Sequence, residues 1–191
     1  RERYPDITFN IQMEDSPKVV ELVTARSVEI GFCGTMVTSH KCVYQDFASD
    51  AMVLITPNTE KYRAFAPGAF PIGQIREETF ISREKGSGTY QAGRELLNQY
   101  GIDIASLRTA VEIRSTESVK QMVSEGLGIG LIAESAAQDY RQFGKILTFP
   151  FPDSTFRRRL YIVKHKNSIL SPIAQVFYDY ARKAGKQASA Q

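Results

Sequence analysis

The feature that most constrains the fold is an alternation of strand-like and helix-like segments between residues 79 and 132. The strand-like segments are short apolar runs, and the longer segments between them have apolar residues at helical spacing and stop at a glycine. The expected elements are a strand at 79–82, a helix at 88–100, a strand at 109–113, a helix at 117–125 and a strand at 128–132. This order predicts an α/β unit in which helices cover a parallel sheet.

Both predicted helices of this region begin in loops rich in hydroxyl groups. The first loop offers Ser82, Ser87 and Thr89 beside two glycines, and the second spans residues 113–120. The first turn of a helix has unpaired N–H groups and a partial positive charge, and glycine lets a ligand approach the backbone. Because each loop follows the C-terminal end of a strand, we expect one shared cleft that holds a small anion. The alternative is that these hydroxyls only cap their helices.

The N-terminal part of the chain predicts a second α/β unit. Apolar residues alternate with polar ones over residues 7–13, which is typical of a strand with one buried face. A proline-containing helix at 15–26 and a buried run at 28–34 follow, so we expect a parallel βαβ unit. Further strands are expected at 43–47, 52–56, 146–149 and 159–163, helices at 59–65, 134–143 and 172–184, and a frayed end at 185–191.

A chain of 191 residues could form one large α/β domain or two lobes, and we favour two. The proline- and glycine-rich stretch 66–73 is the best candidate for a crossover between them. The predicted lobe I therefore comprises residues 1–69 and 160–191, and lobe II comprises residues 70–159.

Composition excludes several functions. The net charge is +3, from 24 basic and 21 acidic residues, and no basic block marks a nucleic-acid surface. The cluster at residues 157–159 is interpreted as a solvated sheet end. The only cysteines, Cys33 and Cys42, are too few for a disulfide framework, and the absence of a signal peptide or spanning apolar run favours the cytoplasm. Cys33 could sense oxidants if its pKa were lowered, but a buried apolar role is favoured.

Nucleotide-binding and catalytic patterns are not found. Residues 86–89 lack the Gly-Lys-Ser/Thr ending of a P-loop, and the glycines at 126, 128 and 130 follow a helix instead of a strand. They are expected to serve a tight helix-to-strand connection. His40 and His165 stand in polar contexts without a nucleophile or metal-binding pattern, so we expect no enzyme activity, no cofactor and no metal.

Six short motifs, in order and at matching spacing, resemble the effector-binding domain of LysR-type transcriptional regulators. They are Tyr4-Pro5-Asp6-Ile7, Glu29-Ile30-Gly31-Phe32, Ser82 to Thr89, Thr116-Glu117-Ser118-Val119-Lys120, Glu125 to Leu131, and Leu170-Ser171-Pro172. The resemblance implies a fold of two Rossmann-like lobes like that of type 2 periplasmic binding proteins, with a small-molecule site between the lobes. Family domains open with a central strand and a helix before the first motif, and that strand is absent from this chain.

The resemblance also implies a function. It predicts an effector-sensing domain that works as a homodimer or homotetramer and reaches DNA only through a winged helix-turn-helix outside this chain. The effector would be a small anion, with Arg83 or Lys85 as possible counter-charges. A solute-binding protein of a transport system is the alternative, and an enzyme on the same fold ranks third. The implied ligand contacts are Ser82, Ser87, Gly88, Thr89, Thr116 and Ser118, with Cys33 or Gly34 from the facing lobe.

Overall fold

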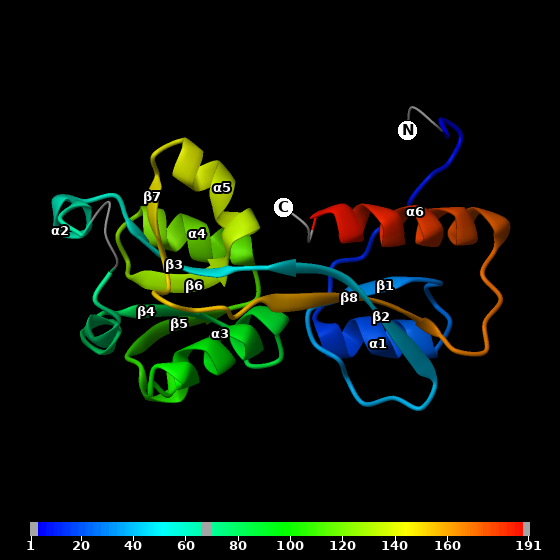
Figure 1. The fold of residues 1–191 in the computed structure, drawn as a ribbon, viewed down its shortest axis with the longest axis horizontal. Coiled ribbons are helices and arrows are strands. Elements are labelled where there is room, and N and C mark those ends of the chain that lie inside the picture. The colour runs from blue at the N-terminus through cyan, green and yellow to red at the C-terminus, as the bar shows by residue number, and fades with distance from the viewer. Residues whose placement is uncertain (1–3, 66–69, 189–191) are drawn as a thin grey trace. The chain divides into compact units, whose positions relative to one another are not determined.

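The computed structural model describes residues 4–65 and 70–188, and the chain in it divides into two compact units. Unit 1 is formed by Arg1–Ala48 and Arg159–Gln191, and unit 2 by Ser49–Arg158. Figure 1 shows the helices and strands of both units with their labels. No helix among the described residues is long and apolar enough to cross a membrane.

Unit 2 is built on a mixed five-stranded sheet with the order β5-β4-β6-β3-β7. β4 runs parallel to β5 and β6, whereas β3 is antiparallel to β6 and β7. The parallel sheet expected from residues 79–132 is confirmed for β4, β5 and β6, and β3 and β7 extend it on one side as antiparallel strands. The strands are β3 (Met52–Pro57), β4 (Phe80–Arg83), β5 (Thr109–Ile113), β6 (Ile129–Ala133) and β7 (Ile146–Pro150).

Helices cover both faces of this sheet (Figure 1). Every residue of β3 is buried; Leu54 packs with Leu96 and Leu97 of α3 on one face, and Val53 packs with Val119 and Val123 of α4 on the other. When both faces of a strand are buried, its sequence is a nearly continuous apolar run, and Met52 to Ile55 of β3 form such a run. The helices are α2 (Glu60–Arg63), α3 (Gly88–Gln99), α4 (Thr116–Ser124) and α5 (Glu134–Gln142), with 3₁₀ turns at Ile72–Glu77 and Ile104–Ser106.

The unit boundary differs from the expected one. Residues 52–65 were predicted in lobe I, but β3 and α2 belong to unit 2 because β3 pairs with β6 and β7. The chain passes between units after Ala48 and after Arg158, inside β2 and at the start of β8. Residues 66–69 of the proposed crossover lie outside the described residues, and the 3₁₀ turn Ile72–Glu77 that follows them is part of unit 2.

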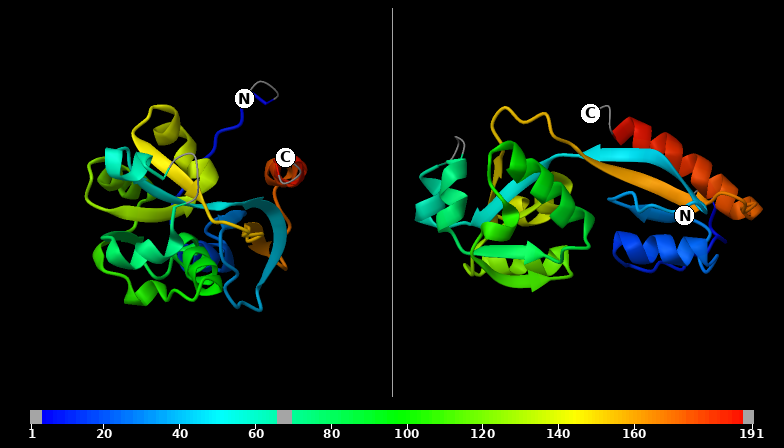
Figure 2. Two further views of the ribbon diagram at one scale, coloured as in Figure 1. Left: turned by 60° about the vertical axis from the view of Figure 1, so that its left-hand side comes forward. Right: turned by 90° about the horizontal axis from the view of Figure 1, so that it is seen from below.

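Unit 1 contains a three-stranded sheet with the order β1-β8-β2 between two helices. Figure 2 shows α1 and α6 on opposite sides of these strands. Val20 and Val23 of α1 pack with Val163 on one face, and Ala174 and Tyr178 of α6 pack on the other. The elements are α1 (Ser16–Thr24), β1 (Gly31–Cys33), β2 (Cys42–Asp50), β8 (Arg158–His165) and α6 (Pro172–Ala188).

The predicted strand at residues 7–13 is wrong, and so is the parallel βαβ unit built on it. This segment has no strand structure, and Ile11 and Met13 are 80% and 93% exposed. β1 pairs antiparallel with β8 instead. Alternation alone cannot form a strand, because the backbone N–H and C=O groups need a neighbouring strand as their partner. The C-terminal helix is also longer than the expected 172–184, because α6 continues to Ala188.

The closely spaced glycines serve the tight connection from α4 to β6 that the sequence predicts. Gly126 has φ +84°, and the amides of Gly126 and Leu127 donate to the carbonyls of Val123 and Met122, which closes the helix in a Schellman-type turn. A Cβ on Gly128 would lie 2.4 Å from the carbonyl oxygen of Thr79. The backbone of the connection therefore passes against the start of β4, where a side chain does not fit.

We predict that Gly128→Ala lowers the free energy of unfolding by about 1–3 kcal/mol, because a rigid backbone atom blocks the added methyl group. The matched control is Gly73→Ala, since a Cβ there meets nothing within 4 Å. Urea unfolding of both variants checks this, and equal stabilities would contradict the close approach at Gly128.

Candidate functional site

The N-terminus of α3 is capped by Ser87. The Ser87 hydroxyl accepts a hydrogen bond from the Tyr90 amide at 3.1 Å, and the Ser87 amide donates to the Glu84 carbonyl at 2.9 Å. Ser87 is 3% exposed and Gly88 is also buried. The Ser87 hydroxyl therefore caps α3, and contact of Ser87 and Gly88 with a ligand stays a prediction.

The N-terminus of α4 is capped by Ser115, one residue before the predicted ligand contact Thr116. The Ser115 hydroxyl accepts from the Ser118 amide at 3.2 Å. Thr116 is the first helical residue, and its hydroxyl is the acceptor of a bond from Arg83 Nη1 at 2.5 Å. Thr116 and Ser118 are both half-buried. Because Ser115 does the capping, the Thr116 hydroxyl faces a different partner.

Arg83 joins the two loops. It is the last residue of β4, opposite Ile113 at the end of β5 in the parallel register. Its Nε donates to the Ile113 carbonyl at 3.1 Å, and Nε and Nη2 donate to the two carboxylate oxygens of Glu84 at 2.9 and 3.0 Å. The Arg83 and Glu84 side chains are only 12% and 16% exposed. A bidentate pair of this kind fixes the guanidinium plane, so the bond to Thr116 is geometrically defined.

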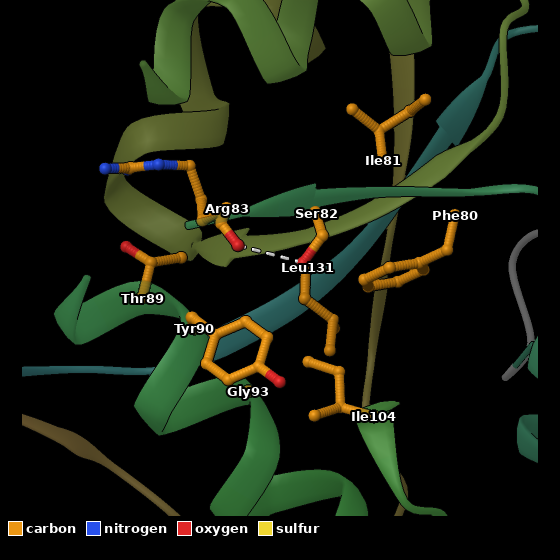
Figure 3. A pocket seen from close by; sticks show the side chains of 9 residues that line it. All are labelled: Phe80, Ile81, Ser82, Arg83, Thr89, Tyr90, Gly93, Ile104 and Leu131. Carbon is orange, nitrogen blue, oxygen red and sulfur yellow. Dashed lines mark hydrogen bonds between the residues drawn. The ribbon is translucent and has the colours of Figure 1, made fainter. Parts of the chain in front are cut away.

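A small pocket lies where β4 meets α3 (Figure 3). Ser82, Arg83 and Thr89 supply its polar side, while Phe80, Ile104 and Leu131 line its apolar side. The Ser82 hydroxyl donates to the Arg83 carbonyl at 3.0 Å, and both Ser82 and Thr89 are 5% exposed. Ser82 of β4 and Thr89 of α3 therefore line one pocket, and Ser87 and Gly88 form the start of the same helix.

Arg158, the first residue of β8, contacts the start of α3, and the sequence interpretation missed this contact. Its Nη1 donates to the Thr89 hydroxyl at 3.2 Å. The arginine cluster was interpreted as solvated, and Arg157 and Arg159 are indeed exposed, but Arg158 is half-buried. Successive side chains of a strand point to opposite faces, so the middle arginine turns inward while its neighbours turn outward. The position of Arg158 between two other arginines at the start of a predicted strand could therefore have indicated an inward-facing arginine.

Of the two counter-charges considered from sequence, Arg83 belongs to the site, and Lys85 is an exposed loop residue. Cys33 and Gly34 lie in unit 1, at the end of β1. Their contribution to ligand binding stays a prediction.

Cys33 does not meet the condition for a reactive thiol. It is 5% exposed, and burial raises its pKa to about 11, although a hydrogen bond with the Thr35 backbone acts in the opposite direction. Cys42 is buried too, and its sulfur lies 3.3 Å from the Thr24 hydroxyl. A thiol with a raised pKa is protonated at neutral pH, so Cys33 behaves as a small apolar core residue.

The described residues contain no group of three or more histidine, cysteine or acidic side chains that could hold a metal ion. His165, expected in a polar surface context, is instead 8% exposed, and its Nδ1 accepts from the Asn167 amide at 3.2 Å. It is a buried structural side chain, distant in sequence from the hydroxyl loops.

The LysR substrate binding domain family matches residues 1–186 of the chain. An uncharacterised HTH-type transcriptional regulator of Methanocaldococcus jannaschii is 27% identical over 180 residues, which cover 94% of this chain and 60% of that protein. The RuBisCO operon transcriptional regulator of Allochromatium vinosum is 25% identical over 183 residues, with 94% and 58% covered. The chain therefore spans about three fifths of the length of these relatives.

Solved structures show the same fold. The regulatory domain of Synechocystis CcmR, in complex with 2-PG, superposes with a TM-score of 0.82 at 23% identity, covering 97% of this chain and 86% of that one. The effector binding domain of QuiR, in complex with shikimate, also gives 0.82, at 15% identity and with 97% and 85% covered. The α/β fold with two sheets, like that of periplasmic binding proteins, is thereby confirmed.

We predict that Cys33 resists alkylation by iodoacetamide in the native protein, because a pKa of about 11 leaves little thiolate at pH 7.5. The labelling rate should rise about tenfold per pH unit between pH 8 and pH 10, as the thiolate fraction does below the pKa. Mass spectrometry of the tryptic peptide measures this, with urea-unfolded protein as the control. Native labelling as fast as in urea would restore the oxidant-sensing alternative.

Proposed function

This chain belongs to the LysR substrate binding domain family, and on that basis we propose that it is the effector-sensing domain of a transcriptional regulator. Its ligand is a small anion that binds at the N-termini of α3 and α4. The named relatives are transcriptional regulators, which disfavours both a transport protein and an enzyme.

The bond from Arg83 to Thr116 is the observation that carries the proposal. It joins the end of β4 to the start of α4 at the edge of the sheet where α3 also begins, and the first turn of each helix presents backbone amides and partial positive charge. Each helix terminus contributes about 0.3–1 kcal/mol to binding a negative charge, and a hydrogen bond to a charged group about 1.5–3 kcal/mol. Three or four such contacts can reach micromolar affinity, or about 8 kcal/mol, after the entropy cost of binding.

The ligands in related structures support a small-molecule effector. CcmR was solved with 2-PG and QuiR with shikimate, both in regulatory or effector-binding domains. We propose that the ligand contacts the side chains of Ser82, Thr89, Thr116 and Ser118 and the backbone amides of Ser87 and Gly88. Cys33 or Gly34 is the proposed contribution of unit 1.

DNA binding and assembly are part of the proposal for the whole protein. The relatives are longer than this chain and are named as HTH-type or operon regulators. We therefore assign DNA contact to a part of the protein outside this chain, in a cytoplasmic homodimer or homotetramer. Effector binding would shift the population of the conformation that positions those DNA-binding parts.

A thermal-shift titration of the domain tests this function. We expect 2-PG, shikimate or inorganic phosphate to raise the melting temperature in a concentration-dependent way, because a ligand that binds only the folded state stabilises it by mass action. Thr116→Ala should weaken binding of the active compound at least several-fold, since the variant loses a hydroxyl at the α4 N-terminus. The variant should stay folded, although its melting temperature without ligand should fall because Arg83 Nη1 loses its acceptor.

The matched control is Ser124→Ala, which removes a half-buried hydroxyl at the other end of α4 that donates to the Gln121 carbonyl. Calorimetry should give unchanged affinity for this control. Equal affinity of Thr116→Ala and wild type would remove Thr116 from the site, and the absence of any anion response would contradict the proposed ligand class.

A further inference from the structure

The guanidinium of Arg158 is incompletely paired. Its one direct hydrogen bond within residues 4–65 and 70–188 goes from Nη1 to the Thr89 hydroxyl. Among the described residues, only Arg158 Nε and Arg182 Nε are fully buried side-chain atoms without a hydrogen-bond partner. In the same part of the chain, no carboxylate lies within 4 Å of the Arg158 side chain. Leaving a charged donor buried and unpaired costs free energy.

The charged groups near Arg158 do not offset the free-energy cost of its unpaired donor. Burial lowers its pKa; the nearby Asp50 raises the pKa, and the positive charge of Arg83 lowers it again. Asp50 uses its own carboxylate as the acceptor for the Ser135 hydroxyl. Arginine stays protonated at neutral pH, so a positive charge persists here without an anion in contact.

Arg83 differs from Arg158 in this respect. The two carboxylate oxygens of Glu84 neutralise its charge; Nε is shared with the Ile113 carbonyl, and Nη1 donates to the Thr116 hydroxyl. Arg83 therefore acts as a positioning residue that holds the α4 N-terminus. Of the two arginines, Arg158 is the one with donors left for a ligand.

We propose that Arg158 is the charge partner of the bound anion, which would lie beside the Thr89 hydroxyl and the first turn of α3. This inference rests on the proposed effector-binding function. The edge formed by Nε and Nη2 matches two oxygens of one carboxylate or phosphate group, with Nη1 kept on Thr89. Because Nε is buried in the structure described here, the guanidinium turns this edge toward the anion when it binds, and the unpaired donor gains its partner.

The test compares Arg158→Gln, Arg158→Lys and the matched control Arg157→Gln by calorimetric titration with 2-PG and with inorganic phosphate. Arg157 is the exposed neighbour, so its replacement removes the same net charge without touching the site. We expect Arg158→Gln to weaken binding about tenfold or more, in line with a lost bidentate charged contact. Arg158→Lys should recover part of the affinity, and Arg157→Gln should change it less than about twofold.

Stability without ligand gives a second readout. Because Arg158→Gln removes an incompletely paired buried charge, its melting temperature should equal or exceed that of the wild type. A marked fall in melting temperature, or failure to fold, would show that Arg158 is structural and would overturn the proposal.

The outcomes separate this inference from the function it rests on. If wild-type protein binds the anions, Thr116→Ala weakens binding and Arg158→Gln does not, the role of Arg158 is refuted and the effector site stands. If wild-type protein binds neither anion, the proposed function and the role of Arg158 fail together.

Discussion

The hydrogen bond from Arg83 to Thr116 is the interaction on which the proposed site depends. A parallel pairing places the C-terminal ends of β4 and β5 side by side, and the helices that follow these strands start at the same edge. The half-buried guanidinium of Arg83 would be costly there without its ion pair to Glu84, which neutralises the charge and sets its plane. Sheet topology places the two helix N-termini at the same edge of the sheet, and the hydrogen bond from Arg83 holds Thr116 beside the end of β4.

Much of unit 2 could be predicted because its signals are local. The apolar run of β6 marks a strand, and the glycines after α3 and α4 mark the ends of these helices. Pairing partners are not local. The sequence of β3 shows that it is buried, but not that it runs antiparallel to β6 and β7 and so belongs to unit 2. For the same reason the alternation at residues 7–13 predicted a strand that the structure does not contain.

The site shows the same division between local and non-local information. Hydroxyl loops at two helix starts were evident from sequence, but which hydroxyl caps each helix was not, because adjacent residues such as Ser115 and Thr116 are chemically alike. Arg158 of β8 contacts Thr89 across 69 residues of sequence. Its role depends on which face of the strand turns inward, and that follows from the fold rather than from the composition of the arginine cluster.

The central claim is that the starts of α3 and α4 form one anion site. The most direct measurement is an NMR titration with 2-PG that follows the backbone amides of Gly88, Thr89, Glu117 and Ser118. The account predicts that amides of both helix starts shift together and fit a single dissociation constant, while amides at the C-terminal ends of the same helices stay in place. Shifts confined to one helix start, or two different dissociation constants, would contradict it.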